Sequence, residues 1–228
     1  MDYITINYTL PFLGFIITLI AQIYVNNSYN KYKYQGLQMK TTGHDVARKI
    51  LDNNGLNNIK IEEVKGDLTD HYDPKKKIIR LSSDIYKGDT IAAASVAAHE
   101  CGHAIQHKEN YTFLKIRSSL VPVVNFSTKF GYIVIVIGLA FSSYKIAIIG
   151  LILLLAMLLF QVVTLPVEFN ASSRAKKQLI ALNIINNSEL EDSKTMLNAA
   201  ALTYVASVLT TLLQILRLAL IIFGRRDD

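Results

Sequence analysis

The chain has 228 residues, 51% of them hydrophobic and only 18% charged, with a mean hydropathy of +0.28. Soluble domains of this length carry more charge, so the composition indicates a membrane protein with one modest polar part. The net charge of +6 favours basic loops beside membrane helices over a nucleic-acid partner, because no basic patch is interleaved with aromatic residues, and the single cysteine, Cys101, excludes an internal disulfide framework.

Residues 4–25 form the first uncharged stretch, which is long enough to span a bilayer as a helix. The stretch has neither a basic n-region nor an A-x-A-like cleavage site. We therefore interpret it as a retained transmembrane helix, with a cleaved leader as the alternative. The polar residues 26–120 that follow are expected to form a small α+β domain.

Two local elements are predicted early in this polar region. Residues 41–56 have the pattern of an amphipathic helix that ends at a glycine and packs through Val46, Ile50 and Leu51. Further on, "DPKK" predicts a turn and "KIIRLSS" predicts a strand. A strand in this position offers an edge that could pair with an extended substrate.

The stretch "GDTIAAASVAAHECGHAIQHKEN" predicts a helix over about residues 90–109, with Asp89 or Thr90 as its N-cap. Residues four apart share one helix face, so His99 and His103 can both direct an imidazole nitrogen at one metal ion. Glu100 lies beside them, where it can take a proton from water. This H-E-x-x-H pattern is typical of zinc peptidases.

Two imidazoles and a carboxylate suit one Zn²⁺ ion, which in catalytic sites takes three protein ligands and leaves a position open. Zinc lowers the pKa of water toward about 7, and Glu100 would complete the deprotonation and return the proton to the leaving amine. The structural alternative is that the two histidines only line a buried helix. His107 continues the same face, but we expect it to interact with the helix C-terminal dipole.

From Val121 to Val167 the chain is nearly all apolar, and a helix of these 47 residues would be roughly 70 Å long, against a hydrocarbon core of about 30 Å. We therefore expect a turn at "SSYK" between transmembrane helices 121–141 and 146–166. A fourth transmembrane helix is expected at 199–223, where Arg217 can snorkel to the interface.

This hairpin places the polar regions 26–120 and 167–198 on the same side of the membrane. They hold fifteen and four of the 24 basic residues, so we expect both to face the cytoplasm, with the amino terminus outside. The third metal ligand can then come from the second region.

Glu168 is the predicted third ligand, because it directly follows an apolar helix, where a carboxylate is costly unless a cation pairs with it. Pro166 is placed to begin a new helix there. Glu189 and Glu191 are expected in a solvated turn and cap. His71 and Tyr72 could reach the site as donors to a developing oxyanion, or could be ordinary loop residues.

Several segments together resemble the YugP-like neutral zinc metallopeptidases, which are small bacterial membrane proteins: "LTDHYDP…IIRLS…IAAASVAAHECGHAIQH", "LVPVVNF", "LFQVVTLPVEFNASSRA" and "LNAAALTYVA". The resemblance implies His99 and His103 as zinc ligands, Glu100 as the catalytic residue, and the membrane as location. More distantly, the plan resembles the HtpX/Ste24-type membrane peptidases. Their second motif is E-x-x-A-D, whereas this chain has "EFNAS", so we expect Asn170 or Ser172 to orient a histidine in place of the aspartate.

These observations predict a mainly α integral membrane protein with about four transmembrane helices and a small α+β, gluzincin-like metallopeptidase domain. We expect a zinc endopeptidase in the bacterial cell membrane, with its site facing the cytoplasm and in contact with the lipid bilayer. Its substrates would be proteins or peptides, including membrane proteins. The alternatives from other classes are a non-catalytic scaffold or chaperone with a structural metal, and a transporter, which is disfavoured because few ionisable residues, such as Arg217, lie well inside the predicted spans.

Overall fold

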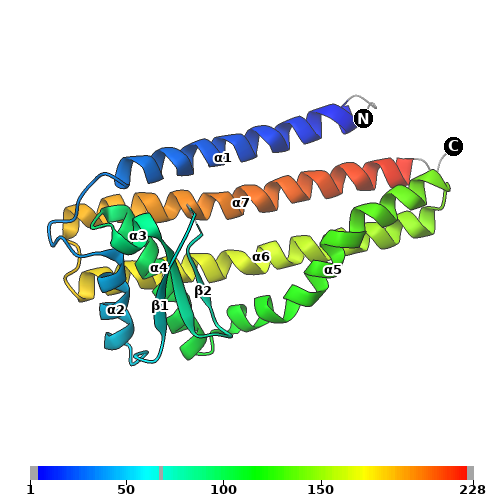
Figure 1. Ribbon diagram of the computed structural model, residues 1–228. Helices are drawn as coiled ribbons and strands as arrows, with labels where there is room; N and C mark the ends of the chain where they lie inside the picture. Colours follow the sequence, from blue (N-terminus) through cyan, green and yellow to red (C-terminus); the bar gives the residue numbers. More distant parts are fainter. Residues whose placement is uncertain (1–4, 67–68, 225–228) are drawn as a thin grey trace. The chain divides into compact units, whose positions relative to one another are not determined.

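The computed structural model describes residues 5–66 and 69–224 (Figure 1). Ile4, the first residue of the predicted anchor, and Leu68, in the quoted "LTDHYDP", lie outside these ranges. Within the described ranges the chain forms a short π-helical turn, seven α-helices and three strands: η1 (Thr5–Thr9), α1 (Leu10–Tyr32), α2 (Gly43–Asn53), β1 (Lys60–Val64), β2 (His71–Asp73), β3 (Ile78–Ser82), α3 (Ser83–Lys87), α4 (Ile91–Lys108), α5 (Thr112–Ala140), α6 (Tyr144–Ala181) and α7 (Asn187–Gly224).

Helices α1, α5, α6 and α7 are each long and apolar enough to cross a membrane. The expectation of a mainly helical protein with four membrane-length helices and a small sheet is therefore confirmed. Helices α6 and α7 have 38 residues each, which corresponds to roughly 57 Å at 1.5 Å per residue. Each is much longer than a hydrocarbon core of about 30 Å, so a helix of this length that spans a bilayer extends beyond the lipid.

The prediction that Pro166 begins a new helix is wrong, because α6 continues through this residue to Ala181. A proline inside a helix removes one N–H donor and costs about 3 kcal/mol. The residues after it compensate by burial along one stripe at helical spacing, where each is 0% exposed: Val167, Ala171, Ala175 and Leu179. Packing of this stripe therefore holds the helix together past its proline.

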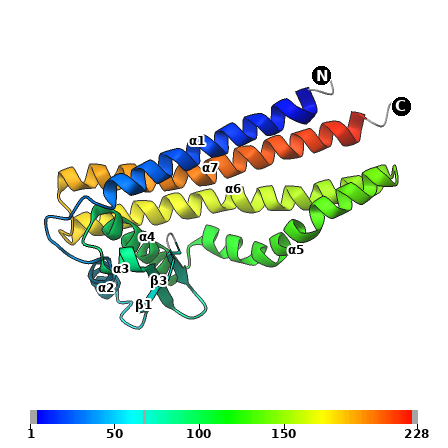
Figure 2. The same ribbon diagram turned by 45° about the horizontal axis from the view of Figure 1, so that its top comes forward.

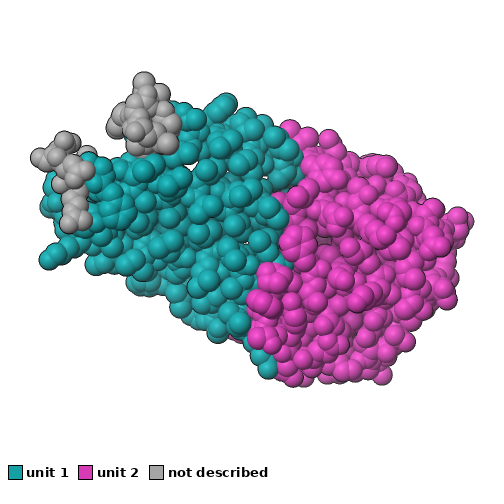
Figure 3. All heavy atoms as spheres, turned by 180° about the vertical axis from the view of Figure 1, so that it is seen from behind, with its two compact units in different colours: residues 1–22, 115–165, 203–228 teal, residues 23–114, 166–202 magenta. Residues whose placement is uncertain are grey.

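The chain divides into two compact units, coloured separately in Figure 3. Unit 1 comprises residues 1–22, 115–165 and 203–228, and unit 2 comprises residues 23–114 and 166–202. Within unit 1, α1 and α7 lie side by side in both ribbon views (Figures 1 and 2), and the hydroxyls of Thr18 and Thr210 hydrogen bond at 3.1 Å. Helices α5 and α6 approach closely, since a Cβ added to Gly138 would lie 2.4 Å from the Ala147 backbone nitrogen.

Unit 2 contains a three-stranded sheet in the order β1-β3-β2. Strand β3 pairs in parallel with β1, with Ile78 opposite Lys60, and antiparallel with β2, with Arg80 opposite His71. Strand β1 was not predicted, because "KIEEV" is largely exposed and three of its five residues are charged. The short β2 is an edge strand of this sheet.

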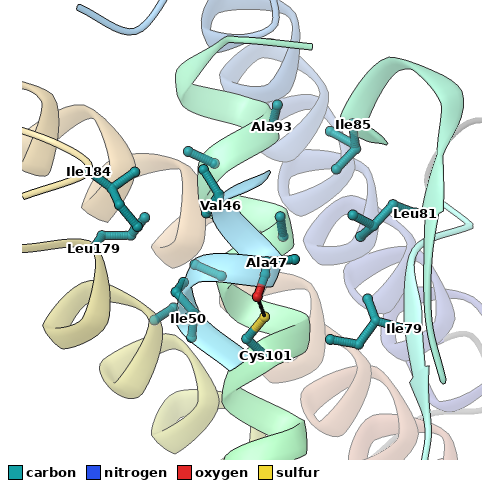
Figure 4. Close-up of a cluster of buried hydrophobic side chains, with 14 of the residues drawn as sticks. Val46, Ala47, Ile50, Ile79, Leu81, Ile85, Ala93, Cys101, Leu179 and Ile184 are labelled. Atoms are coloured by element: carbon teal, nitrogen blue, oxygen red, sulfur yellow. Dashed lines mark hydrogen bonds between the residues drawn. The ribbon is translucent and has the colours of Figure 1, made fainter. Parts of the chain in front are cut away.

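The core of unit 2 gathers side chains from α2, α4 and β3 together with Leu179 and Ile184 (Figure 4). The predicted packing face of α2 is confirmed, since its three residues are all 0% exposed: Val46, Ile50 and Leu51. Helix α4 buries most of its length, because its alanines let neighbouring elements approach on several sides. A side-chain hydrogen bond of 3.6 Å from the Cys101 thiol to the Ala47 carbonyl joins α4 to α2. The predicted histidine helix is therefore buried at the centre of unit 2.

Candidate metal centre

Helix α4 sets the positions of the two histidines. Thr90 caps its start, with a hydroxyl that accepts the N–H of Ala93 at 3.2 Å, as expected for a threonine N-cap. One turn separates His99 from His103, and their ring centroids lie 4.8 Å apart with an interplanar angle of 88°. The rings therefore stand edge to face on one side of the helix.

Helix α6 contributes a carboxylate to the same place. Glu168 is 3% exposed, and its Oε2 lies 3.3 Å from Nε2 of His99 and 3.6 Å from Nε2 of His103. One ligand atom from each residue lies within 4.8 Å of the other two. The structure thus brings together the three residues predicted as metal ligands, although 69 positions separate the first from the last.

The arrangement fits a tetrahedral zinc ion. Zinc binds imidazole nitrogen and carboxylate oxygen at about 2.0–2.2 Å, so two ligands of one tetrahedral ion lie roughly 3.3–3.5 Å apart. The two measured nitrogen–oxygen distances of 3.3 and 3.6 Å are close to this separation. His99, His103 and Glu168 therefore form a group that could hold a zinc ion, since zinc takes two imidazoles and a carboxylate as ligands in some of its sites.

The second nitrogen of each imidazole has a partner of its own. Nδ1 of His99 lies 3.1 Å from the Ser172 hydroxyl, and Nδ1 of His103 lies 3.0 Å from Oε1 of Gln106. Both Nε2 atoms are left to face Glu168, which is how metal-ligating histidines are commonly oriented. The sequence suggested Asn170 or Ser172 as the residue that orients a histidine. Ser172 contacts His99, whereas Asn170 contacts Gln106. Sequence reasoning missed Gln106, since nothing in its spacing sets it apart.

Close packing of α4 against α6 fixes the distance between the candidate ligands. A Cβ added to Gly102 would lie 2.5 Å from the carbonyl oxygen of Ala171, closer than side-chain atoms can approach. Only glycine permits this separation of the two helices. The histidines lie on either side of Gly102 in α4, and Glu168 lies one turn before Ala171 in α6.

Glu100 is adjacent to this group and is only 7% exposed. Burial alone would lower the pKa of His103, but the hydrogen bond with Glu168 and the negative charges of Glu100 and Glu168 raise this pKa above its ordinary value. The pKa of Asp70 is raised, mainly by burial and in part by repulsion from Glu100, although Ser82 donates hydrogen bonds to its carboxylate. Asp70, which sequence reasoning did not single out, is therefore a buried carboxylate close enough to Glu100 to be repelled by its charge.

The two candidate oxyanion donors are on β2. His71 is exposed, and its Nε2 lies 3.3 Å from a guanidinium nitrogen of Arg80. The hydroxyl of Tyr72 lies 2.9 Å from Nδ1 of His107. His107 thus contacts a strand residue, in addition to its predicted position near the C-terminus of α4. His107 lies one helical turn after His103, so Tyr72 contacts α4 one turn beyond the candidate ligands.

One expectation about the acidic residues is wrong. Glu189 is buried, not solvated, at 6% exposure, and its carboxylate accepts the backbone N–H groups of Gln38 and Asn186. The sequence correctly indicated a helix cap, but the chain segment containing Gln38 covers it. Glu191 is exposed and pairs with Lys194.

The fold and the site together define a helical protein with four membrane-length helices and a candidate metal site of two histidines and a glutamate. Residues 7–223 match the model of a family described as "Putative neutral zinc metallopeptidase". The chain belongs to this family. It is similar to the "Putative membrane protease YugP" of Bacillus subtilis (strain 168), at 44% identity over 208 residues that cover 91% of this chain and 92% of the relative. No solved structure matches the chain significantly.

Removing the carboxylate should abolish tight zinc binding. We expect Glu168→Ala to weaken zinc affinity more than about 100-fold, a larger loss than substitutions outside the ligand set produce. Metal content of the purified protein, measured by mass spectrometry, provides the test. Glu191→Ala, which removes an exposed glutamate, is the matched control and should keep wild-type zinc. Full zinc retention in Glu168→Ala would show that the third ligand is another residue.

Separating α4 from α6 should also weaken the site. Gly102→Ala inserts a methyl group against the Ala171 carbonyl, so we expect a loss of stability of about 1–3 kcal/mol and zinc affinity reduced by at least about tenfold. Thermal unfolding and zinc titration check both effects. Gly36→Ala is the control, because a Cβ at Gly36 meets nothing within 4 Å. Equal behaviour of the two variants would contradict the close packing described above.

Proposed function

We propose that the protein is a membrane-embedded, zinc-dependent endopeptidase that hydrolyses peptide bonds of proteins in or beside the membrane. The convergence of Nε2 of His99, Nε2 of His103 and Oε2 of Glu168 carries this proposal, with the buried Glu100 adjacent. A family of zinc metallopeptidases and a relative named as a membrane protease support it. One zinc ion per chain would suffice.

The reaction assigns separate roles to the residues. His99, His103 and Glu168 would hold the metal, which when bound lowers the pKa of water toward about 7 and polarises a carbonyl group. Glu100 accepts a proton from the attacking water and passes it to the leaving amine. The low exposure of Glu100 suits this role, because burial keeps bulk water from intercepting the proton that Glu100 transfers.

Strand β2 is the proposed binding edge for the substrate. It pairs on one side with β3, and it carries Tyr72 toward the end of α4 through the contact with His107. An extended peptide added to its other side would run antiparallel or parallel to β2 and receive main-chain hydrogen bonds. Tyr72, or His71 beside it on the same strand, would then donate a hydrogen bond to the oxygen of the polarised carbonyl.

The membrane sets the range of substrates. Glu168 lies 24 residues after Tyr144, the first residue of α6, which is roughly 36 Å along the helix axis and just beyond a hydrocarbon core of about 30 Å. The basic residues of the two polar regions favour a cytoplasmic site in a bacterial cell membrane. A site at this depth is accessible to segments of membrane proteins as they leave the bilayer.

A non-catalytic scaffold with a structural metal is less well supported. Structural zinc sites are closed by four protein ligands, whereas the group found among the described residues offers three. A structural site also has no use for a buried glutamate beside its ligands. The endopeptidase proposal accounts for both features.

Glu100→Gln should separate metal binding from catalysis. The variant keeps all three ligands, so we expect wild-type zinc content and cleavage reduced by at least about 10²–10⁴-fold. New amino termini can be compared by mass spectrometry in membranes that contain wild-type protein, Glu100→Gln or the control Glu191→Gln. We expect termini specific to active protein, located in cytoplasmic segments of membrane proteins. Identical termini in wild type and Glu100→Gln would contradict the proposed mechanism. Cleavage in segments outside the cytoplasm would show that the site faces the other side of the membrane.

Tyr72→Phe tests the proposed oxyanion donor. Loss of the hydroxyl should lower kcat by about 10²–10³-fold with little change in KM, because the hydrogen bond strengthens only as charge develops on the substrate oxygen. Steady-state kinetics on a peptide taken from the mapped cleavage sites would measure both constants. Tyr34→Phe, at an 80% exposed tyrosine, is the control. An unchanged kcat in Tyr72→Phe would remove this residue from the reaction.

A further inference from the structure

Gln106 is the most completely buried polar side chain beside the metal centre, at 0% exposure. Its Oε1 lies 3.0 Å from Nδ1 of His103 on the same helix. Its Nε2 donates to the carbonyl of Val167 at 2.8 Å and to Oδ1 of Asn170 at 3.0 Å, both on α6. One amide therefore joins a histidine on α4 to the backbone next to Glu168.

The direction of this amide is set by its neighbours. A backbone carbonyl can only accept a hydrogen bond, so the NH₂ group of Gln106 must face Val167. Asn170 agrees, because its Oδ1 also accepts from Nε of Arg174 at 2.7 Å, and a guanidinium can only donate. Arg174 is held in turn by Glu109, 2.7 Å from its Nη2. With its NH₂ group committed to α6, Gln106 can present only its oxygen to His103.

The protonation pattern of His103 follows from that oxygen. Oε1 of Gln106 cannot donate, so Nδ1 of His103 must carry the proton of their hydrogen bond. Nε2 is then the nitrogen whose lone pair is available to a metal, and it is the nitrogen that faces Glu168 at 3.6 Å. The hydrogen-bond partner of one ring nitrogen commonly sets the role of the other in this way.

We propose that Gln106 is a positioning residue that fixes which nitrogen of His103 binds the metal and ties that histidine to the α6 backbone that carries Glu168. The inference rests on the metal centre of the proposed function, but not on peptidase activity. It assigns to a glutamine of α4, and to its partner Asn170, part of the work that the aspartate of an E-x-x-A-D motif would do. Ser172 serves only His99.

The first test needs no substitution at Gln106. In zinc-loaded protein labelled with [¹⁵N]histidine, long-range ¹H–¹⁵N NMR spectra distinguish a protonated ring nitrogen from one that binds metal. We expect His103 to bind through Nε2 with a proton on Nδ1, and His103→Gln identifies its signals by their loss. Zinc on Nδ1 of His103 would overturn the proposal.

The second test measures affinity. Gln106→Met keeps the length of the side chain and removes both its acceptor and its donors, so we expect zinc affinity to fall about 10–100-fold in a chelator competition. Ser95→Ala, on the same helix as Gln106, is the control, because it breaks the buried 2.8 Å hydrogen bond to Ser193 of α7 but touches no candidate ligand. Gln106→Met with zinc affinity within about twofold of Ser95→Ala would overturn the proposal. If Gln106→Met does not fold, the NMR result decides.

Neither measurement involves cleavage, so the two proposals can fail separately. Wild-type protein that binds zinc through Nε2 of His103 and cleaves nothing would contradict the endopeptidase and leave the role of Gln106 intact. Protein that cleaves substrate but keeps its zinc affinity in Gln106→Met would contradict the role of Gln106 and leave the endopeptidase proposal intact.

Discussion

The candidate site depends on the contact between α4 and α6 at Gly102, where no side chain fits between the helix and the Ala171 carbonyl. The sequence around this point is arranged alike on both helices. His99 lies three residues before Gly102 and His103 one residue after it, while Glu168 and Ser172 have the same offsets from Ala171. Since residues three and four apart share a helix face, one close crossing brings all four side chains together. The candidate metal ligands are therefore placed by backbone packing and not by flexible loops.

Burial explains why these polar groups are so fully paired. Glu168, Ser172 and Gln106 are buried, and an unpaired polar group in a protein interior costs about 1–3 kcal/mol, while an unpaired charge costs more. Ser172 and Gln106 each hydrogen bond to one histidine through Nδ1, and Glu168 faces the Nε2 atoms of both histidines. A dication between these atoms would neutralise the buried carboxylate. Metal binding and the folding of unit 2 should thus be coupled.

The predictable part of the structure is the part that local sequence specifies. Long uncharged runs indicated the four membrane-length helices, and i, i+4 spacing placed His99 and His103 on one face. Glu168 followed from topology, because a hairpin returns the chain to the same side of the membrane. By contrast, continuation of α6 through Pro166 depends on the stripe that packs after it, and the burial of Glu189 depends on the segment around Gln38. The role of Gln106 arises from contacts 61 and 64 positions away, which no local pattern encodes.

X-ray absorption spectroscopy of the zinc-loaded protein is the most direct test of the central claim, that His99, His103 and Glu168 form a zinc site. The account predicts one zinc per chain, bound only by nitrogen and oxygen at about 2.0–2.2 Å, with imidazole scattering from two histidines. The Cys101 thiol is buried and donates a hydrogen bond to the Ala47 carbonyl, so no sulfur should be bound to the zinc. A sulfur shell at about 2.3 Å, or protein that binds no zinc, would contradict the account.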